Sequence, residues 1–343
     1  MKLIIAVLLG SSLLLSCSGP GNEFRYQTDA LDWGTDTCLV YGHKAPDVDA
    51  VASSIALSRL MCSLGHYCEP RLAGPANRET KFVSGRLGFS LPIVQESVLP
   101  GTRIILTDHS EYAQSVNGVK EAKVLQIIDH HPGGDIDGVP FVVCDKIGAA
   151  STLVWELYGK AGVEVDNATA SVLLSGILSD THFLTKNATQ RDSTALLSLA
   201  AQLDMGAEQL AELSKGMSEA DSDYSGMSDT EMYLDDVRDY VMSGRQVRIG
   251  SLDWAGHEAL DAFLDRVLGA MHSLDDGKTL YFAKVDARAD DGTAVSYILY
   301  SGAEAEKTAL ACFGKPVREG VCRSSRKINR KYDLVPMLTK ALE

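Results

Sequence analysis

Histidines and aspartates gather at a few points of this chain, and most of these groups directly follow a short apolar run. They follow residues 38–41, 103–107 and 124–128, and they comprise His43, Asp47 and Asp49, then Asp108 and His109, then Asp129, His130 and His131. Asp180 comes at the end of a helical pattern over 168–178. Imidazole and carboxylate together suit manganese, iron, cobalt or zinc. Two such ions can clamp a phosphoryl group and activate water, so the pattern predicts a two-metal hydrolytic centre.

Each group on its own has an ordinary structural explanation. Asp47 or Asp49 could cap the helix expected from Val48, and a lone His43 would more often bond to a loop. Asp-His-His also occurs by chance. Five of the eight histidines, however, lie in or beside these loops, at 43, 109, 130, 131 and 182. Core packing does not explain that clustering, and the complete ordered set favours a metal site.

Strands that alternate with helices must position these residues. The apolar runs 38–41, 103–107, 124–128 and 141–143 are typical of short strands, and helical spacing covers 48–64, 149–159, 168–178 and 193–203. The alternation predicts an α/β fold with a mostly parallel sheet and helices on both faces. Ligands of such sheets collect at the carboxyl ends of the strands, which is where the groups fall.

A polar, acidic and aperiodic stretch, 218–230, divides the chain. We interpret it as an interdomain linker; the alternative is a surface loop within one domain. After it come strands near 247–252, 279–285 and 295–299, and a helix near 257–272, which predict a smaller mixed α/β domain over 231–343. The first domain would span 37–217. A length of 343 residues suits two domains.

The N-terminus has the features of an export signal. Lys2 precedes an apolar run over 3–9, and Leu14-Leu15-Ser16-Cys17 resembles the bacterial lipobox. This predicts a signal peptide over 1–16, a lipid on Cys17 and a tether over 17–36. The mature chain would be exported and held at a bacterial membrane, on the periplasmic face or the cell surface. The alternative is a plain signal peptide with an incidental cysteine.

Charge and cysteine content narrow the choice of partners. A net charge of -14 argues against a nucleic-acid surface, since phosphate backbones are held mainly by excess Lys and Arg. The six remaining cysteines match no CxxC metal pattern. Cys312 and Cys322 could close across a hairpin or could be buried as small apolar groups, and the sequence leaves both open.

Four segments together resemble the motifs of the DHH phosphoesterase superfamily: His43-Lys44-Ala45-Pro46-Asp47-Val48-Asp49-Ala50, Thr107-Asp108-His109-Ser110-Glu111, Asp129-His130-His131 and Ser179-Asp180-Thr181. Two details resemble the family II, manganese-dependent inorganic pyrophosphatases. They are Asp108-His109-Ser110-Glu111 followed by Gln114-Ser115, and Ser325-Arg326-Lys327 near the C-terminus. The resemblance runs from about residue 38 to the end and implies a DHH domain followed by a DHH-associated C-terminal domain.

The resemblance also implies roles for single residues. His43 and Asp47 would hold one metal, Asp49, His130 and Asp180 the other, and Asp108 would bridge both, with a nucleophilic hydroxide between them. His131 would face the phosphate and Asp129 would orient a ligand. Arg326 and Lys327 would grip the distal phosphate on closure of the C-terminal domain. The family pattern further implies Mn²⁺ or Co²⁺ at two sites, Mg²⁺ arriving with substrate, and a homodimer formed through the N-terminal domain.

Some positions depart from that pattern. Arg238 stands where these pyrophosphatases carry a phosphate-binding Lys, and Ala45, Ser110 and Pro132 replace an Asn, an Asn and an Arg. No metal ligand is lost, so the departures bear on substrate preference. Hydrolysis of pyrophosphate to two orthophosphates is the leading prediction. The alternatives are an exopolyphosphatase or other phosphoanhydride hydrolase acting on short polyphosphate, and a non-catalytic lipoprotein that binds metal or phosphate.

Overall fold

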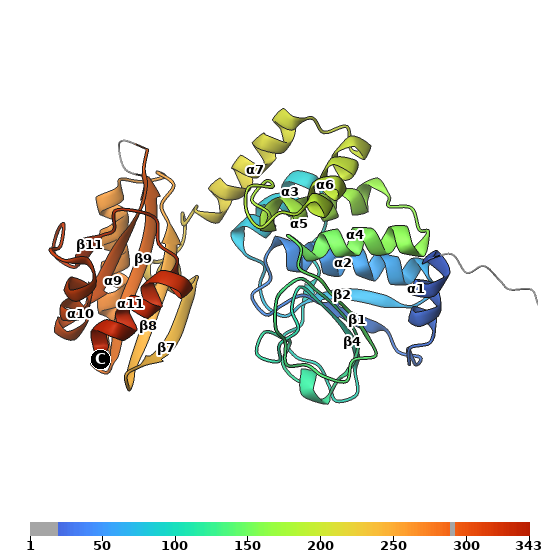
Figure 1. The fold of residues 1–343 in the computed structure, drawn as a ribbon, viewed down its shortest axis with the longest axis horizontal. Coiled ribbons are helices and arrows are strands. Elements are labelled where there is room, and N and C mark those ends of the chain that lie inside the picture. Colours follow the sequence, from blue (N-terminus) through green and yellow to red (C-terminus); the bar gives the residue numbers. More distant parts are fainter. Residues whose placement is uncertain (1–19, 289–291) are drawn as a thin grey trace, which may run out of the picture. The chain divides into compact units, whose positions relative to one another are not determined.

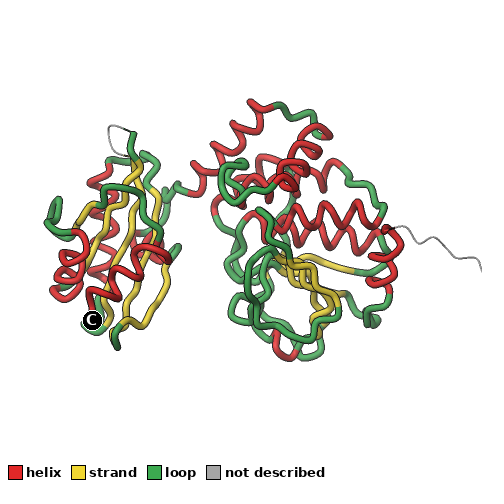
Figure 2. Tube along the Cα trace, in the orientation of Figure 1, coloured by secondary structure: helices red, strands yellow, loops and turns green. Residues whose placement is uncertain are grey.

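A computed structural model describes residues 20–288 and 292–343, and the chain divides into two compact units between Met217 and Ser218 (Figures 1 and 2). The predicted signal peptide and the lipid-bearing Cys17 lie outside the described residues. None of the helices in the described ranges is long and apolar enough to cross a membrane.

The first unit is built on a six-stranded parallel sheet in the order β3-β2-β1-β4-β5-β6. Its strands are β1 (Cys38–Tyr41), β2 (Cys68–Leu72), β3 (Ile93–Val94), β4 (Arg103–Thr107), β5 (Lys123–Asp129) and β6 (Phe141–Cys144). The predicted α/β class with a parallel sheet is confirmed. Strands β2 and β3 were not expected, because Cys68–Leu72 contains Pro and charged residues and β3 is only two residues long.

Helices pack against one face of this sheet. They are α2 (Val48–Ser63), α3 (Arg78–Leu87), α4 (Ala150–Ala161), α5 (Asn167–Asp180), α6 (Gln190–Gln202) and α7 (Ala207–Asp221). Val40, Ile105 and Ile128 on the strands share one core with Leu57 and Leu153 on the helices. Helices α2 and α4 therefore pack directly on the strands that end in the His and Asp groups, and α5 packs on α2 and α4.

The second face differs from the expectation of helices on both sides. There Tyr41, Ile104 and Leu106 pack against the loop residues Val98 and Val116. Within the described part of the chain, this face carries loops and the short 3₁₀ helix η1 (Val119–Glu121). The strand order explains this, because the chain runs outward from β1 to β3 and then returns to β4 and proceeds the other way. Because the strand order reverses between β1 and β4, right-handed crossovers place the two sets of connections on opposite faces.

The residues just before β1 belong to the folded unit. Helix α1 (Pro20–Asp29) packs on α4, and its Phe24 side chain is 4% exposed. The rings of Phe24 and Phe141 meet edge to face, with their centroids 5.7 Å apart. Arg25 Nε donates to the carbonyl of Ala161 at 2.6 Å. Asp32 pairs with Arg103 at 3.0 Å. The prediction of a tether over 17–36 is therefore wrong for residues 20–36.

The second unit is a five-stranded mixed sheet in the order β11-β10-β9-β8-β7, with β8 and β9 parallel and the other pairs antiparallel. Its elements are α8 (Asp229–Leu234), β7 (Val237–Met242), β8 (Arg245–Asp253), α9 (Leu260–Leu274), β9 (Thr279–Arg288), β10 (Ala294–Ser301), α10 (Ala303–Phe313), β11 (Val321–Arg323), the π-helix η2 (Arg330–Leu334) and α11 (Val335–Leu342). Helices α8 and α9 pack on one face and α10 and α11 on the other. The predicted mixed C-terminal fold is confirmed.

Two smaller expectations can be placed on this fold. Residues 218–230 contain the last turn of α7 and the start of α8, with an irregular connection only between them. Cys312 and Cys322 are free thiols. Cys312 lies partly buried on α10 and Cys322 is buried on β11, so only Cys322 matches the expectation of a buried small apolar group.

Replacement of Phe24 by alanine should destabilise the metal-free N-terminal unit by about 3–5 kcal/mol, as for other buried aromatic truncations. Urea unfolding followed by circular dichroism measures the change. Tyr26→Ala on the same helix is the matched control, because Tyr26 is 76% exposed. Equal stability of the two variants would mean that α1 adds nothing to the core.

Candidate metal centre

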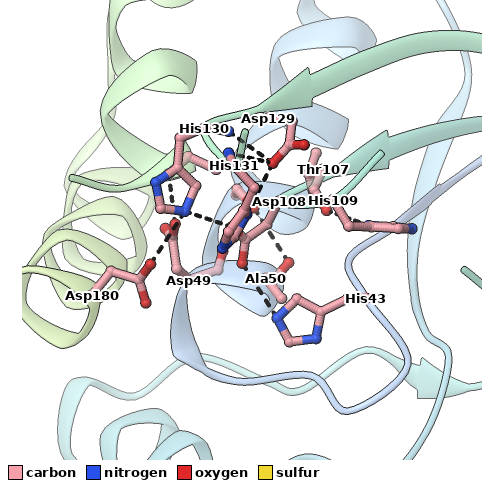
Figure 3. Close-up of polar contacts among 12 residues, drawn as sticks. His43, Asp49, Ala50, Thr107, Asp108, His109, Asp129, His130, His131 and Asp180 are labelled. Carbon is pink, nitrogen blue, oxygen red and sulfur yellow. Dashed lines mark hydrogen bonds and ion pairs between the residues drawn. The ribbon is translucent and has the colours of Figure 1, made fainter. Parts of the chain in front are cut away.

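The carboxyl ends of β1, β4 and β5 lie side by side where the strand order reverses, and they bring His43, Asp108 and His130 together (Figure 3). Helix α2 begins there with Asp47 and Asp49, and α5 ends there with Asp180. All six residues predicted from sequence to be metal ligands thus surround one place. Such a reversal is where open parallel sheets bind their ligands.

Asp108 is the central residue of the cluster. Its carboxylate is 1% exposed, with Oδ2 3.4 Å from His43 Nε2 and Oδ1 2.9 Å from His130 Nε2. Each oxygen therefore faces a different imidazole. The backbone at Asp108 is left-handed, with φ of 61°, a conformation that Asp tolerates better than most residues. Its N–H donates to the carbonyl of Ile128 at 2.8 Å, which ties the turn to β5.

His109 fixes this turn from the other side. Its Nδ1–H donates to the carbonyl of Thr107 at 2.8 Å, and its Nε2 accepts from the hydroxyl of Ser115 at 2.9 Å. Burial lowers the pKa of His109 to about 4, so the ring stays neutral in this role. His109 and His182 belong to none of the His and Asp groups that could hold a metal among the described residues.

Asp47 serves the helix and the cluster at the same time. Its Oδ1 accepts from the N–H of Ala50 at 3.0 Å and caps α2, while its Oδ2 lies 3.3 Å from His43 Nε2. A Cβ added to Gly42 would meet the carbonyl oxygen of Ala50 at 2.7 Å, so only glycine lets α2 start this close to β1. The helix cap, which was the alternative to metal binding, therefore uses only Oδ1 of Asp47, and Oδ2 still faces the cluster.

Asp49 is fully buried and belongs to the same group of possible ligands as Asp108, His130 and Asp180. Its two oxygens accept from the N–H groups of Ala150 at 2.6 Å and Ser151 at 2.9 Å, at the N-terminus of α4. A helix N-terminus carries partial positive charge and stabilises this carboxylate. Sequence reasoning missed this support, because backbone amides preceded by small residues give no chemical signal.

His130 joins Asp108 to Asp180, whose Oδ2 lies 3.3 Å from His130 Nε2. The Nδ1–H of His130 donates to the carbonyl of Ile147 at 3.0 Å, which directs Nε2 to the cluster. A second bond of this kind is the usual way in which proteins orient a metal-binding histidine.

Asp129 organises the loop instead of entering the cluster. Its Oδ1 accepts from the backbone N–H groups of His130 at 2.8 Å and His131 at 3.1 Å, and from Nδ1 of His131 at 3.1 Å. Its Oδ2 accepts from the hydroxyl of Ser110 at 2.7 Å. Ser110 is one of the departures from the family pattern, and here it holds the residue that orients both histidines.

The donor atoms fit metal ions. Asp108 Oδ1 and His130 Nε2 are buried without hydrogen-bond partners although they lie 2.9 Å apart, as expected of atoms that face a common point. The groups that could hold an ion include His43, Asp47 and Asp108, and also Asp49, Asp108, His130 and Asp180. Both sets mix imidazole nitrogen with carboxylate oxygen, which suits manganese or cobalt. Asp108 is common to both.

The electrostatics of the cluster also call for cations. Burial raises the pKa of Asp180 to about 6, and burial together with the neighbouring carboxylates raises the pKa of Asp49 well above its usual range. Burial alone would raise the pKa of Asp108, but contacts with His130 and His43 hold it low. Asp47, Asp49, Asp108 and Asp180 thus place four carboxylates in one cluster, of which Asp49 and Asp108 are fully buried, and two divalent ions would balance their charge.

Comparison with known proteins agrees with this geometry. The model of the DHH family, N-terminal domain, matches residues 37–177. A probable manganese-dependent inorganic pyrophosphatase of Streptococcus mutans is 30% identical over 219 residues, which cover 63% of this chain and 70% of that protein. One of Lactobacillus helveticus is 29% identical over 315 residues, or 89% of this chain and 98% of that protein. The chain belongs to the family of manganese-dependent inorganic pyrophosphatases.

One solved structure is similar in fold to this chain over most of its length. It comes from Methanococcus jannaschii, is described as a family II inorganic pyrophosphatase, and is 26% identical with a TM-score of 0.66. The match covers 90% of this chain and 99% of the other. Relatives and structure therefore extend over both units, beyond the matched DHH domain.

The three predicted phosphate-binding residues lie in the C-terminal unit. Arg326 Nη2 is 2.8 Å from Asp333 Oδ1, and Lys327 Nζ is 2.8 Å from Asp286 Oδ2. Arg238 is exposed on β7. The sequence did not single out Asp286 or Asp333, because nothing in the chain order links either carboxylate to the basic segment.

Manganese binding to this cluster should release protons. Burial by itself lowers the pKa of His130, but Asp108 and Asp180 outweigh it and raise the pKa to about 12, so the metal-free imidazole is charged at neutral pH. A metal must displace that proton, and affinity should rise about tenfold per pH unit for each proton released. Calorimetry between pH 6 and 8, in buffers of different ionisation enthalpy, measures the release. An affinity independent of pH would contradict the assignment of His130.

Proposed function

We propose that this protein hydrolyses inorganic pyrophosphate to two orthophosphates. The observation that carries the proposal is the carboxylate of Asp108, whose two oxygens face His43 and His130 in two separate ligand sets. The full-length similarity to proteins named manganese-dependent inorganic pyrophosphatases supports it.

The proposal includes two ions, Mn²⁺ or Co²⁺, and Mg²⁺ that arrives with substrate. His43, Asp47 and Asp108 would hold one ion, and Asp49, Asp108, His130 and Asp180 the other. When bound, such ions neutralise phosphate charge and supply a nucleophile near neutral pH. Asp108 would keep the two sets at a fixed separation, because both its backbone and its neighbours hold it in place.

His131 is suited to contact the substrate directly. Its side chain is 49% exposed, and Asp129 binds its Nδ1, which leaves Nε2 for a phosphate oxygen. The hydrogen bond to Asp129 raises the pKa of His131, which favours a protonated ring that donates to substrate. Arg326, Lys327 and Arg238 would offset charge on the leaving phosphate.

One observation keeps a second activity in view, the hydrolysis of longer polyphosphates. Arg238 stands where the family pattern has Lys, and a planar guanidinium binds phosphate differently from an ammonium. The non-catalytic alternative is disfavoured, since all six proposed ligands converge and two of their buried atoms lack hydrogen-bond partners.

We also propose that the chain is exported, that residues 1–16 are a signal peptide and that Cys17 carries a lipid. Helix α1 includes Pro20, three residues after Cys17, so this lipid would hold the N-terminal unit close to the membrane surface. A homodimer formed through the N-terminal unit is part of the same proposal and rests on the family resemblance. Light scattering of the delipidated chain tests it.

Phosphate release from pyrophosphate, tripolyphosphate and long-chain polyphosphate, with manganese added, is the primary test of function. We expect a strong preference for pyrophosphate, lost in Asp108→Ala because both ligand sets lose their shared oxygen donor. Faster cleavage of the longer chains would reassign the protein as a polyphosphatase. Release no greater than in a chelated control would favour a binding lipoprotein.

The shared position of Asp108 predicts different metal contents for single variants. Asp108→Asn should lose both tightly bound manganese ions, whereas Asp180→Asn should lose one and keep the other. Asp129→Asn is the control, since it only orients a ligand and should weaken binding by about 10- to 100-fold. Manganese titration followed by electron paramagnetic resonance counts the ions. Loss of a single ion in Asp108→Asn would contradict the bridging role.

A further inference from the structure

Strand β9 of the C-terminal unit carries a buried ion pair. Lys284 and Asp286 are each 5% exposed, and Lys284 Nζ lies 2.6 Å from Asp286 Oδ2. They are two residues apart and so point to the same face of the sheet. Ser296 on β10 donates to Asp286 Oδ1 at 2.5 Å. Burying two charges is costly, and such a pair needs a reason beyond packing.

The same carboxylate also binds Lys327, one of the proposed phosphate-binding residues. Lys327 Nζ lies 2.8 Å from Asp286 Oδ2 and 3.4 Å from Asp253 Oδ1, and its side chain is 57% exposed. Burial lowers the pKa of Lys327, but Asp253 and Asp286 outweigh it and raise the pKa, so the ammonium stays charged at neutral pH. One oxygen of Asp286 therefore holds a buried and an exposed ammonium together.

The segment that contains Arg326 and Lys327 is anchored to this end of the sheet. Asp253, Asp286 and Ser296 are register partners across β8, β9 and β10 and form one row. The N–H of Ser324 donates to the carbonyl of Ser296 at 2.8 Å, and the N–H of Ile328 donates to its hydroxyl at 3.0 Å. The ends of the segment 324–328 are thus fixed, and Asp286 fixes the ammonium between them.

The charge balance shows what Lys284 adds. Asp286 alone would cancel the charge of Lys327, and Asp253 would then leave an excess of negative charge beside the segment. Arg326 offers no surplus, because its guanidinium is paired with Asp333. With Lys284 present, the positive charges of Lys284 and Lys327 equal the negative charges of Asp253 and Asp286. A phosphate approaching this segment therefore meets no net repulsion.

We propose that Lys284 is a positioning residue for phosphate binding: it neutralises Asp286, so that this carboxylate orients the ammonium of Lys327 without cancelling its attraction for a phosphate group. This rests on the proposed function only in taking a phosphate oxygen as the ligand of Lys327. Lys284 itself is buried and does not touch the substrate.

The test compares Lys284→Gln, which keeps a hydrogen-bond donor but loses the charge, with Lys284→Arg, which keeps the charge. In Lys284→Gln we expect KM for pyrophosphate to rise at least about threefold with kcat nearly unchanged, and the rise to shrink at high salt. Lys284→Arg should restore KM. Asp253→Asn should change KM in the opposite direction, because it removes a negative charge beside Lys327.

A second readout does not depend on activity. The pKa of Lys327, measured by NMR of ¹³C-methylated lysines in the full chain, should rise by about half a pH unit in Lys284→Gln, because a like charge has been removed. It should fall in Asp253→Asn. If the wild-type chain releases no phosphate, the proposed function fails while these shifts still test Lys284.

A folded Lys284→Gln with unchanged KM and unchanged pKa of Lys327 would overturn the proposal and leave Lys284 as a packing residue. Equal losses in Lys284→Gln and Lys284→Arg would overturn it too. If Lys284→Gln does not fold, Asp253→Asn decides: an unchanged pKa of Lys327 there contradicts the electrostatic argument, and a fall supports it.

Discussion

The shared carboxylate of Asp108 is the constraint on which the N-terminal unit depends. A carboxylate buried to this degree is unstable unless cations or strong donors surround it, and here His43 and His130 approach its two oxygens separately. That arrangement is possible only where β1, β4 and β5 end beside one another. The reversal of strand order between β1 and β4 meets this need, because it sends the following loops to opposite faces and leaves the strand ends open.

Two of the remaining proposed ligands, Asp47 and Asp49, also make hydrogen bonds that stabilise the fold. Asp47 caps α2 with one oxygen, and Asp49 accepts from two amides at the start of α4. A structural role and the proposed ligand role are therefore compatible at these positions, since a carboxylate has two oxygens and several lone pairs. The consequence is that α2 and α4 must both be in place before the cluster can form.

Much of the N-terminal unit can be predicted from sequence, because its signals are local. The bounds of β4 agree with the apolar run 103–107, and each predicted ligand follows a strand, begins α2 or ends α5. The loop-covered face could not be predicted, since the face that a right-handed connection covers follows from strand order, and no local pattern encodes strand order. Helix α1 was predicted to be a tether because its sequence is mostly polar, and the contacts that hold it, Phe24 with Phe141 and Arg25 with Ala161, are distant in sequence. The Lys284–Asp286 pair escaped notice because its partners, Lys327 and Ser296, are distant in sequence.

The two units handle charge in opposite ways, and the difference bears on substrate choice. The N-terminal cluster collects carboxylates whose charge cations can balance. In the C-terminal unit the cations of the segment around Arg326 and Lys327 are each paired with a carboxylate, so their net attraction is small and adjustable. In a chain with a net charge of -14, long-range attraction of an anion is weak, and short-range contacts must select it. Under the proposed function, discrimination between pyrophosphate and longer chains would depend on Arg238, Arg326 and Lys327 and on the carboxylates that hold them, whereas the proposed metal ligands would set the reaction class.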